Sequence, residues 1–494
     1  MKPLSPTDAM FLWLEQRRHP MHVAGLQLYT PPPGAGKDFV KELLEGWRKH
    51  TVAQPPFNLR ARFRLGHWFW EDDTEFELDY HVRHSALPQP GRIRELLALV
   101  SRLHGALMDR TRPLWELNVI EGLADGRIAV YAKVHHAMFD GVAAARMLAA
   151  VLSEDPGEER PPLWAQRRQA RTPHAETAPT PAPTPSRFEP LLGVLRAGAE
   201  IMPGIGSGLW EIVRAAHLHP SDAKPFQAPP TMFNVAISGS RRFAAQSYSL
   251  ERIKALGKAA GATVNDVTLA VCSGALRRYL QAQNALPDKP LIAMVPVSVR
   301  SADHEEGGNH VAMLLANLAT HVEDPLARLK LIKESTSAAK ERLAKMSRLE
   351  QVAHAAAMAT PMGPSILTGY ARKRPIFNLV ISNVPGPKKP LYMNGLPLDE
   401  IYPVSIPMDY MALNITIGGY CDQLGFGYTA CRRSVPGLQR FLDHTDDSLR
   451  ELEASLGLDQ PAAAAAAAVA SAVVPAAVAP DAGGGDGASE EVRE

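Results

Sequence analysis

The sequence predicts an α/β protein, of the α/β or α+β class, built from two structured blocks. Segments whose apolar residues repeat with a helical period alternate with segments of strand period along most of the 494 residues. A single core seldom grows to this length, so we expect two cores. A stretch rich in Pro, Thr and Ala lies between the blocks and lacks the apolar side chains that a packed core needs.

Shifts in composition divide the chain into five parts. We expect an N-terminal half (1–155), an exposed linker with polyproline II character (156–190), a crossover segment (191–225), a C-terminal half (226–457) and a disordered, Ala-rich tail (458–494). The apolar residues of the crossover segment allow two interpretations. They fit a helix packed on a core, which we favour, or an amphipathic helix at a membrane surface.

Local sequence patterns place the elements of each half. Ser5 suits an N-cap, Pro6 a first helical turn and Asp8 the third position, so a helix should begin there. In the N-terminal half we further expect strands at 23–29, 63–70, 117–121 and 127–134, and helices at 38–48, 93–108 and 142–152. In the C-terminal half we expect helices at 250–259, 266–283, 325–345 and 435–456, and strands at 291–299, 311–319, 377–382, 411–420 and 424–429.

Charge and cysteine content exclude several classes of protein. Lys and Arg number 53 and Asp and Glu 52, which excludes a strongly basic nucleic-acid binder. Cys272, Cys421 and Cys431 show no CxxC spacing and are too few for a disulfide framework. A reducing, cytoplasmic location therefore fits best. The uncharged stretch 461–480 is mostly Ala and is interrupted by Pro475, so we do not expect it to span a membrane.

The stretch 127–141 contains the most informative side chains. Read with a period of two, it places alternate residues on opposite faces: Ile128, Val130, Ala132, Val134 and His136 on one, and Tyr131, Lys133 and His135 on the other. If the strand continues to His136, that ring lies in apolar surroundings, which favour the neutral imidazole that a general base near pH 7 requires. The period therefore selects His136 over His135 as the base.

The same residues allow other interpretations. A histidine on an apolar face is often only a core residue with satisfied hydrogen bonds. His135, His136 and Asp140 could bind a metal, but neighbouring strand residues point in opposite directions, and no HExxH motif is present. Asp140 is either a helix N-cap or a carboxylate that orients a histidine or braces the loop. Gly141 would allow a tight turn into the next helix.

His135-His136-Ala-Met-Phe-Asp140-Gly141 fits the pattern HHxxxDG. This pattern resembles the signature of acyltransferases with the chloramphenicol-acetyltransferase-like fold, which condensation domains of peptide synthetases share. Four further segments resemble motifs of bacterial wax ester synthase/diacylglycerol acyltransferases, in the family's order: 3–25, 109–123, 263–270 with Asn265 and Asp266, and 378–387. From the residues alone, Thr263 and Asp266 also suit a capping box, and Pro113 and Trp115 suit simple packing.

The resemblance implies two similar halves with mixed sheets and a tunnel between them. It implies transfer of a long-chain acyl group from acyl-CoA to diacylglycerol or a fatty alcohol, with His136 as the base. Because a thiolate is a good leaving group, we expect no cofactor or metal. Asn265 and Asp266 would support the site across the interface. A peripheral location at the inner membrane or at lipid droplets would follow from the lipid products. The alternatives are an acyl donor bound to a carrier protein and a non-catalytic lipid-binding protein.

Overall fold

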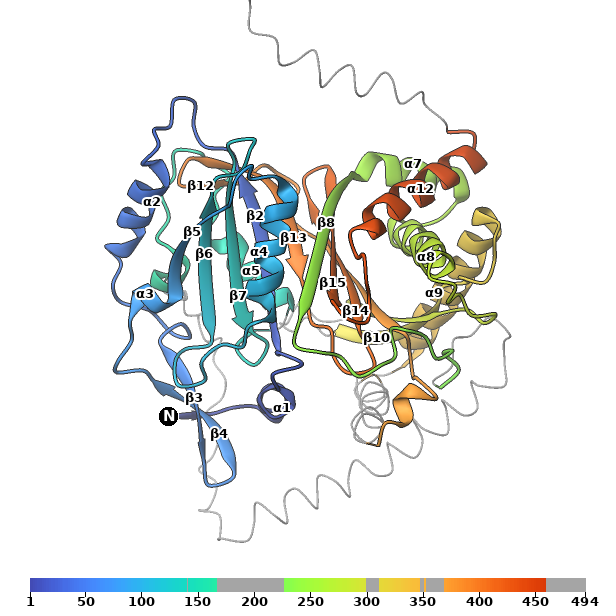
Figure 1. Cartoon of the computed structure of the whole chain (residues 1–494), viewed down its shortest axis with the longest axis horizontal. Helices are drawn as coiled ribbons and strands as arrows, with labels where there is room; N and C mark the ends of the chain where they lie inside the picture. Colours follow the sequence, from blue (N-terminus) through green and yellow to red (C-terminus); the bar gives the residue numbers. More distant parts are fainter. Residues whose placement is uncertain (140, 167–225, 299–310, 347–350, 352–367, 459–494) are drawn as a thin grey trace, which may run out of the picture.

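The computed structural model confirms the predicted mixture of helices and sheets. It describes residues 1–139, 141–166, 226–298, 311–346, 351 and 368–458 (Figure 1). Within these residues, two six-stranded sheets stand side by side, with helices packed against them and with a small three-stranded sheet below the N-terminal one (Figure 1). The predicted segments 191–225 and, apart from Leu458, 458–494 lie outside the described residues.

The sheet of the N-terminal half is mixed, and two of its strands come from late in the chain. Its order is β12-β13-β2-β7-β6-β5. The strands span His22–Tyr29 (β2), Val82–Ala86 (β5), Trp115–Glu121 (β6), Ile128–His135 (β7), Tyr392–Met393 (β12) and Leu396–Val404 (β13). β7 runs antiparallel to β2 and β6, whereas β5 is parallel to β6. The end of β7 therefore lies beside the start of β2.

Helices and a hairpin complete the N-terminal half. They are α1 (Pro6–Leu14), α2 (Phe39–Arg48), α3 (Leu78–His81), α4 (Ile93–Gly105), α5 (Gly141–Ala150) and the strands β1 (Lys2–Pro3), β3 (Leu59–Arg64) and β4 (His67–Asp72). Ser5 caps α1 as predicted, because its hydroxyl accepts from the N–H of Asp8. The single strand predicted at 63–70 is wrong. Leu65 and Gly66 both have positive φ and turn the chain into the β3–β4 hairpin.

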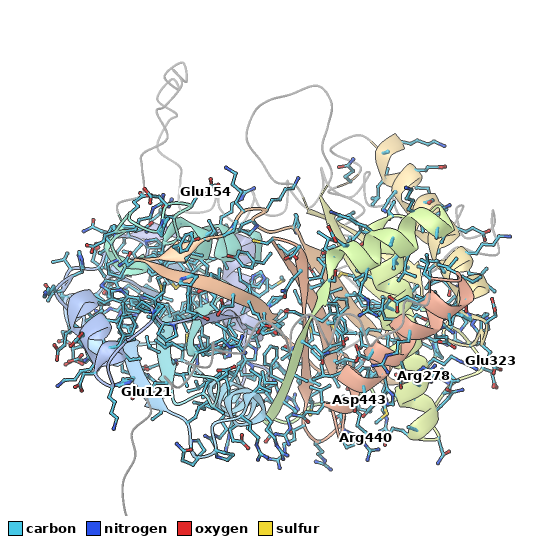
Figure 2. All side chains as sticks on the ribbon, turned by 90° about the horizontal axis from the view of Figure 1, so that it is seen from above. Glu121, Glu154, Arg278, Glu323, Arg440 and Asp443 are labelled. Atoms are coloured by element: carbon cyan, nitrogen blue, oxygen red, sulfur yellow. The ribbon has the colours of Figure 1, made fainter. Side chains whose placement is uncertain are left out.

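The C-terminal half is a second mixed sheet with helices packed against it. Its order is β10-β9-β11-β14-β15-β8. The elements are β8 (Arg241–Ser249), α7 (Leu250–Ala260), α8 (Val264–Ala282), β9 (Ile292–Ser298), β10 (Val311–Asn317), α9 (Pro325–Lys345), β11 (Leu379–Val384), β14 (Leu413–Tyr420), β15 (Gln423–Cys431) and α12 (Arg440–Ser455). Figure 2 shows Arg278 on α8 and Arg440 and Asp443 on α12 at the outer side of this half.

β13 joins the two halves by crossing close to β15. A Cβ atom added at Gly425 would lie 2.1 Å from the carbonyl oxygen of Ile401, and one at Gly427 would lie 2.0 Å from that of Pro403. The backbones of β13 and β15 can therefore approach only because these two residues are glycines. The sequence pattern does not predict β13, since Pro397 and Pro403 are unusual within a strand.

The predicted linker 156–190 is wrong for its described part. Residues 163–165 form a short 3-10 helix, and Trp164 is fully buried in the N-terminal core. The Trp164 indole N–H donates to the carbonyl of His50, and its ring stacks on Trp115 at 5.8 Å. One large aromatic side chain thus anchors a segment whose composition indicates a linker. Residues 167–190 lie outside the described part of the chain.

Candidate active site

β7 ends at the first residue of the histidine pair, and both of its faces are buried. Val130, Ala132 and Val134 lie in the apolar core on one face, as the period of two predicts. The opposite face is mixed, because Ala129 and Tyr131 belong to a second buried apolar cluster while Lys133 and His135 are buried polar residues. The hydroxyl of Tyr131 donates to Nδ1 of His104 at 2.8 Å, and Nζ of Lys133 lies 3.0 Å from the carboxylate of Glu116. His135 belongs to this second face, which is buried against other elements.

His135 is fully buried, with a close contact at each ring nitrogen. Its Nδ1 accepts from the backbone N–H of Ala137 at 3.1 Å, and its Nε2 lies 3.3 Å from Oε1 of Glu15. Because Nδ1 accepts, a proton sits on Nε2, on the side of the ring where the Glu15 carboxylate lies. His135 therefore fixes the turn at the end of β7.

Glu15 connects this turn to helix α1 and to the segment that begins with Asp109. Nε of Arg110 lies 2.9 Å from Oε2 of Glu15, and the same guanidinium donates to the carbonyl of Leu12. Burial alone would raise the pKa of Glu15, but the hydrogen bonds and charges of His135 and Arg110 outweigh it, so the pKa is lowered. The ionised carboxylate thus has a basic side chain on each oxygen.

His136 follows β7 directly and is partly exposed. Its backbone N–H donates to the carbonyl of Met21 at 2.9 Å, and its ring stacks on Phe11 of α1 with centroids 3.9 Å apart. The strand predicted at 127–134 is confirmed to within one residue at each end, and β7 ends at His135, so the strand does not continue to His136. The ring nevertheless has an apolar neighbour on one face. This arrangement leaves His136, and not His135, accessible to a substrate.

Of the last two residues of the HHxxxDG pattern, the structure describes Gly141 but not Asp140. Asp140 lies outside the described residues, so its role as a cap, a brace or a chemical group stays a prediction. Gly141 is the first residue of α5, which agrees with the predicted turn into a helix at that point.

The segment 109–116 packs around the histidine turn. Its Leu114 carbonyl accepts from the N–H of His135 at 2.9 Å. The Trp115 ring stacks on His81 at 4.4 Å, and its indole N–H donates to the carbonyl of Phe57. The packing role considered for Trp115 is therefore confirmed, and the segment also supports the backbone of the candidate site.

Asn265 and Asp266 lie at the start of α8 in the C-terminal half. Thr263 and Asp266 form the predicted capping box. The other carboxylate oxygen of Asp266 accepts from the hydroxyl of Thr336 in α9 at 2.7 Å, and the carbonyl of Asn265 accepts from Thr268. These bonds explain why Asp266 is buried. A supporting role across the interface with His136 stays a prediction.

The segment 378–387 is held from both of its ends. Asn378 is fully buried, and its side chain bonds to Ile292, Pro229 and Asn234. A Cβ atom at Gly386 would lie 1.7 Å from the carbonyl oxygen of Gly419, so the turn after β11 packs directly on β14. Both the Asn378 hydrogen bonds and the close packing at Gly386 fix the position of β11 in its sheet.

Sequence reasoning missed Glu15, Arg110 and Phe11 as parts of the site. All three lie in segments that carry the family resemblance. No local period links them, because Glu15 and Arg110 are 95 residues apart in sequence. The sequence carries no signal for Glu15, because its burial is visible only in the structure.

A pocket lies beside α5 inside the N-terminal half. Its lining is mostly apolar and includes Leu117, Val130, Leu148, Val151, Trp164 and Met393. Arg160 and Asn394 are among its polar residues. The tunnel expected between the halves stays a prediction.

Two family models together match most of the chain. Residues 4–268 match the wax ester synthase/diacylglycerol acyltransferase catalytic domain, and residues 307–453 match the C-terminal domain of the same family. The chain belongs to the wax ester synthase/diacylglycerol acyltransferase family. The resemblance inferred from the HHxxxDG pattern and the four segments is thereby confirmed.

Named members of this family are similar over nearly their whole length. A probable diacylglycerol O-acyltransferase of Mycobacterium tuberculosis is 47% identical, over 93% of this chain and all of the relative. The O-acyltransferase WSD of Acinetobacter baylyi is 42% identical, over 94% of this chain and all of the relative.

Solved structures agree with the family assignment and the fold. The wax ester synthase/diacylglycerol acyltransferase of Marinobacter aquaeolei is 45% identical, with a TM-score of 0.76 over 93% of this chain and all of that one. The first condensation domain of the calcium-dependent antibiotic synthetase is 15% identical, with a TM-score of 0.54 over 93% of this chain and 96% of that one. The second similarity concerns the fold alone.

Proposed function

We propose that this chain is an O-acyltransferase that transfers a long-chain acyl group from acyl-CoA to diacylglycerol, to a long-chain fatty alcohol, or to both. The observation that carries this proposal is the geometry of the histidine pair in a member of this family. His135 is fully buried and held by Glu15, whereas the adjacent His136 is partly exposed and stacked on Phe11. Relatives named for these activities support the same conclusion.

In the proposed reaction, His136 removes the proton from the acceptor hydroxyl as its oxygen attacks the thioester carbonyl carbon. The tetrahedral intermediate collapses by breaking the carbon–sulfur bond, and the thiolate takes the proton back from the imidazolium. One proton-transfer group and correct orientation of the two substrates suffice, because a thiolate leaves readily. We therefore propose that no cofactor or metal takes part and that acyl-CoA acts only as a substrate.

Both proposed acceptors are apolar molecules that carry one reactive hydroxyl. An apolar binding site discriminates weakly between alkyl chains, so we expect several acceptors and chain lengths to react.

The experiment that tests this function measures CoA release by the full chain from palmitoyl-CoA. Hexadecanol, dioleoylglycerol and a buffer blank are compared as acceptors, and the lipid product is identified. Acceptor-dependent release with a matching ester product is expected. If transfer occurred only from an acyl group bound to a carrier protein, that group and not acyl-CoA would be the donor. Lipid binding with no transfer from either donor would leave a non-catalytic role.

We also propose a cytoplasmic protein that works at the surface of the inner membrane or of lipid droplets, because its proposed acceptors and products are insoluble in water. Within the described residues, no single helix is both long and apolar enough to cross a membrane. Helices α7 and α8 reach these criteria only together, across a bend of 100°. The segment 190–219, whose amphipathic interpretation suggested a contact with lipid, lies outside the described residues.

A further inference from the structure

Exposed apolar side chains gather at one end of the N-terminal half. Among the described residues, eleven large hydrophobic side chains are exposed, and six of them lie in or beside α1 and the β3–β4 hairpin. These six are Met1, Met10, Trp13, Leu14, Phe63 and Leu65. We call the group the α1–hairpin surface. Such a concentration is unusual for the surface of a protein that only faces water.

The helical part of this surface is a stripe that faces outward. Met10, Trp13 and Leu14 are spaced i, i+3 and i+4, and they are 47%, 60% and 38% exposed. Leu12, between them in sequence, is buried and holds the helix in place. The apolar stripe of α1 therefore stays exposed in the described part of the chain.

The hairpin continues the same surface. The Trp13 ring lies 5.1 Å from Phe63 and 6.1 Å from Trp68, both in edge-on contacts. At the tip of the hairpin, Leu65 is 98% exposed beside Gly66. A leucine that projects this far has almost no apolar contact in the described molecule. Its side chain would leave water if it entered an apolar phase.

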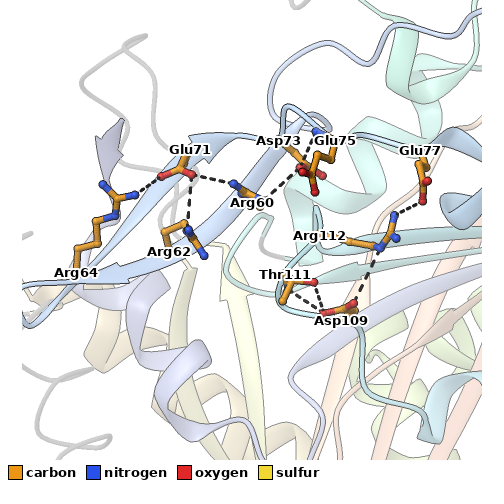
Figure 3. A network of polar contacts seen from close by, with 10 residues as sticks. All are labelled: Arg60, Arg62, Arg64, Glu71, Asp73, Glu75, Glu77, Asp109, Thr111 and Arg112. Atoms are coloured by element: carbon orange, nitrogen blue, oxygen red, sulfur yellow. Dashed lines mark hydrogen bonds and ion pairs between the residues drawn. The ribbon is translucent and has the colours of Figure 1, made fainter.

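Basic side chains border the surface. Arg60, Arg62 and Arg64 gather around the single carboxylate of Glu71 along the hairpin (Figure 3). The outer two arginines have 46% and 54% of their side chains exposed.

Further charges lie around the same end. Lys2 and Arg17 are exposed there, while the acidic Asp8 accepts a hydrogen bond from Ser5 and Asp73 pairs with Arg60. Four exposed basic side chains, Lys2, Arg17, Arg62 and Arg64, stand against the three carboxylates of Asp8, Glu71 and Asp72, which leaves a small basic excess. This excess suits an anionic surface.

The surface also lies beside the candidate active site. Phe11, in the same helix as Trp13, stacks on His136 at 3.9 Å. Both α1 and the hairpin lie at the lower end of the N-terminal half in Figure 1, where β7 ends. A lipid phase that contacts α1 would thus deliver an insoluble alcohol close to His136.

We propose that the α1–hairpin surface docks on anionic phospholipid bilayers, with Trp13 and Leu65 entering the interface and Arg62 and Arg64 contacting lipid phosphates. Exposed Trp and aliphatic groups with a basic border are typical of proteins that lie on membranes. This inference rests on the proposed function only for the identity of the lipid substrates. Binding to the bilayer itself requires no turnover.

The test is sedimentation of the full chain with vesicles of phosphatidylcholine, with and without phosphatidylglycerol. The wild type should bind the anionic vesicles more strongly, and salt should weaken this binding. The double variant Trp13→Gln/Leu65→Ser should bind at least about tenfold more weakly. Arg62→Gln/Arg64→Gln should lose most of the preference for anionic lipid.

Matched controls lie at the opposite end of the N-terminal sheet. Ile93 is 42% exposed, and the side chain of Arg94 is 72% exposed. Ile93→Ser and Arg94→Gln should bind vesicles as the wild type does. As a measurement that does not depend on losing binding, a polarity-sensitive dye on Leu65→Cys should report an apolar environment with vesicles, and one on Ile93→Cys should not.

Equal vesicle binding by the wild type and the Trp13→Gln/Leu65→Ser variant would overturn the proposal, as would an unchanged dye at position 65. Dimers that dissociate in this variant, without vesicle binding by the wild type, would instead assign the surface to a second copy of the chain. Turnover of a short acyl-CoA and a soluble alcohol is measured in parallel. Its absence would count against the proposed function, whatever the vesicle result.

Discussion

Two adjacent histidines have different environments at the end of β7. His135 is buried between the N–H of Ala137 and the carboxylate of Glu15, and His136 is partly exposed against Phe11. The turn that presents His136 is therefore held by Glu15, which is itself held by Arg110. Glu15 and Arg110 are positioning residues in this arrangement, because they act on His136 through its neighbour.

Replacing Glu15 by Gln tests this positioning role. In the wild type, each carboxylate oxygen of Glu15 faces a nitrogen donor, from His135 or from Arg110. Glutamine replaces one oxygen by an NH₂ group, which is itself a donor, so at least one of these two contacts is lost. We expect kcat to fall between about tenfold and a hundredfold, with KM nearly unchanged. The measurement is the kcat and KM of acyl transfer, together with the melting temperature.

Glu453→Gln is the matched control for this variant. Glu453 pairs with Arg252 in the C-terminal half at 2.8 Å, in a partly exposed position. We expect its kcat to equal that of the wild type. If Glu15→Gln kept full kcat, or lost activity only because it melted lower, the positioning role of Glu15 would be wrong.

At the scale of elements, β13 pairs with β2 in the N-terminal sheet although it comes from the C-terminal part of the chain. It passes β15 at close distance only because two residues of β15 are glycines. Gly427→Ala places a methyl group 2.0 Å from the carbonyl oxygen of Pro403, so β13 has to move. We expect a loss of about 2–3 kcal/mol in the free energy of unfolding, measured by urea titration. Gly46→Ala in α2 meets no atom within 4 Å and should slightly stabilise the protein. Equal stability of the two variants would contradict this view of the crossing.

The sequence predicts elements best where the signal is local. The cap of α1, the cap of α8 and the apolar alternation of β7 are each encoded within a few consecutive residues. The structure confirms all three. β13 carries two prolines, and its pairing with β2 joins residues more than 350 positions apart, so no local pattern marks it. For the same reason the contact of Glu15 with His135 could not be predicted, whereas the histidine pair itself could.

At the scale of the whole molecule, several histidines are buried as neutral groups. Burial lowers the pKa of His81 to about 4 and that of His104 to about 3, and it lowers the pKa of His22 well below its usual value. His104 donates to the carbonyl of Ser405 just after β13, and His22 donates to the carbonyl of His104. These bonds link α4, β2 and the crossing strand.

These histidines predict that acid destabilises the fold. Between the lowered folded pKa and the unfolded pKa near 6.5, only the unfolded chain takes up protons, so stability is lost as pH falls through this window. Each histidine contributes up to about 1.4 kcal/mol per pH unit. Urea unfolding between about pH 7 and pH 5 measures the slope.

His81→Gln should give a shallower pH dependence than the wild type, because it removes one group that titrates only on unfolding. His50→Gln changes an exposed histidine and should leave the slope unchanged. A wild-type stability that stays constant over this pH range would contradict the neutral burial of these histidines.

The most direct test of the whole molecule's proposed chemistry compares the wild type with His136→Ala. The measurement is the initial rate of CoA release from palmitoyl-CoA, with and without hexadecanol, at equal concentrations of folded protein. We predict that the acceptor-dependent rate falls by about 10²- to 10⁴-fold while the melting temperature is retained. A variant that kept acceptor-dependent release near the wild-type rate would show that His136 is not the base for acyl transfer.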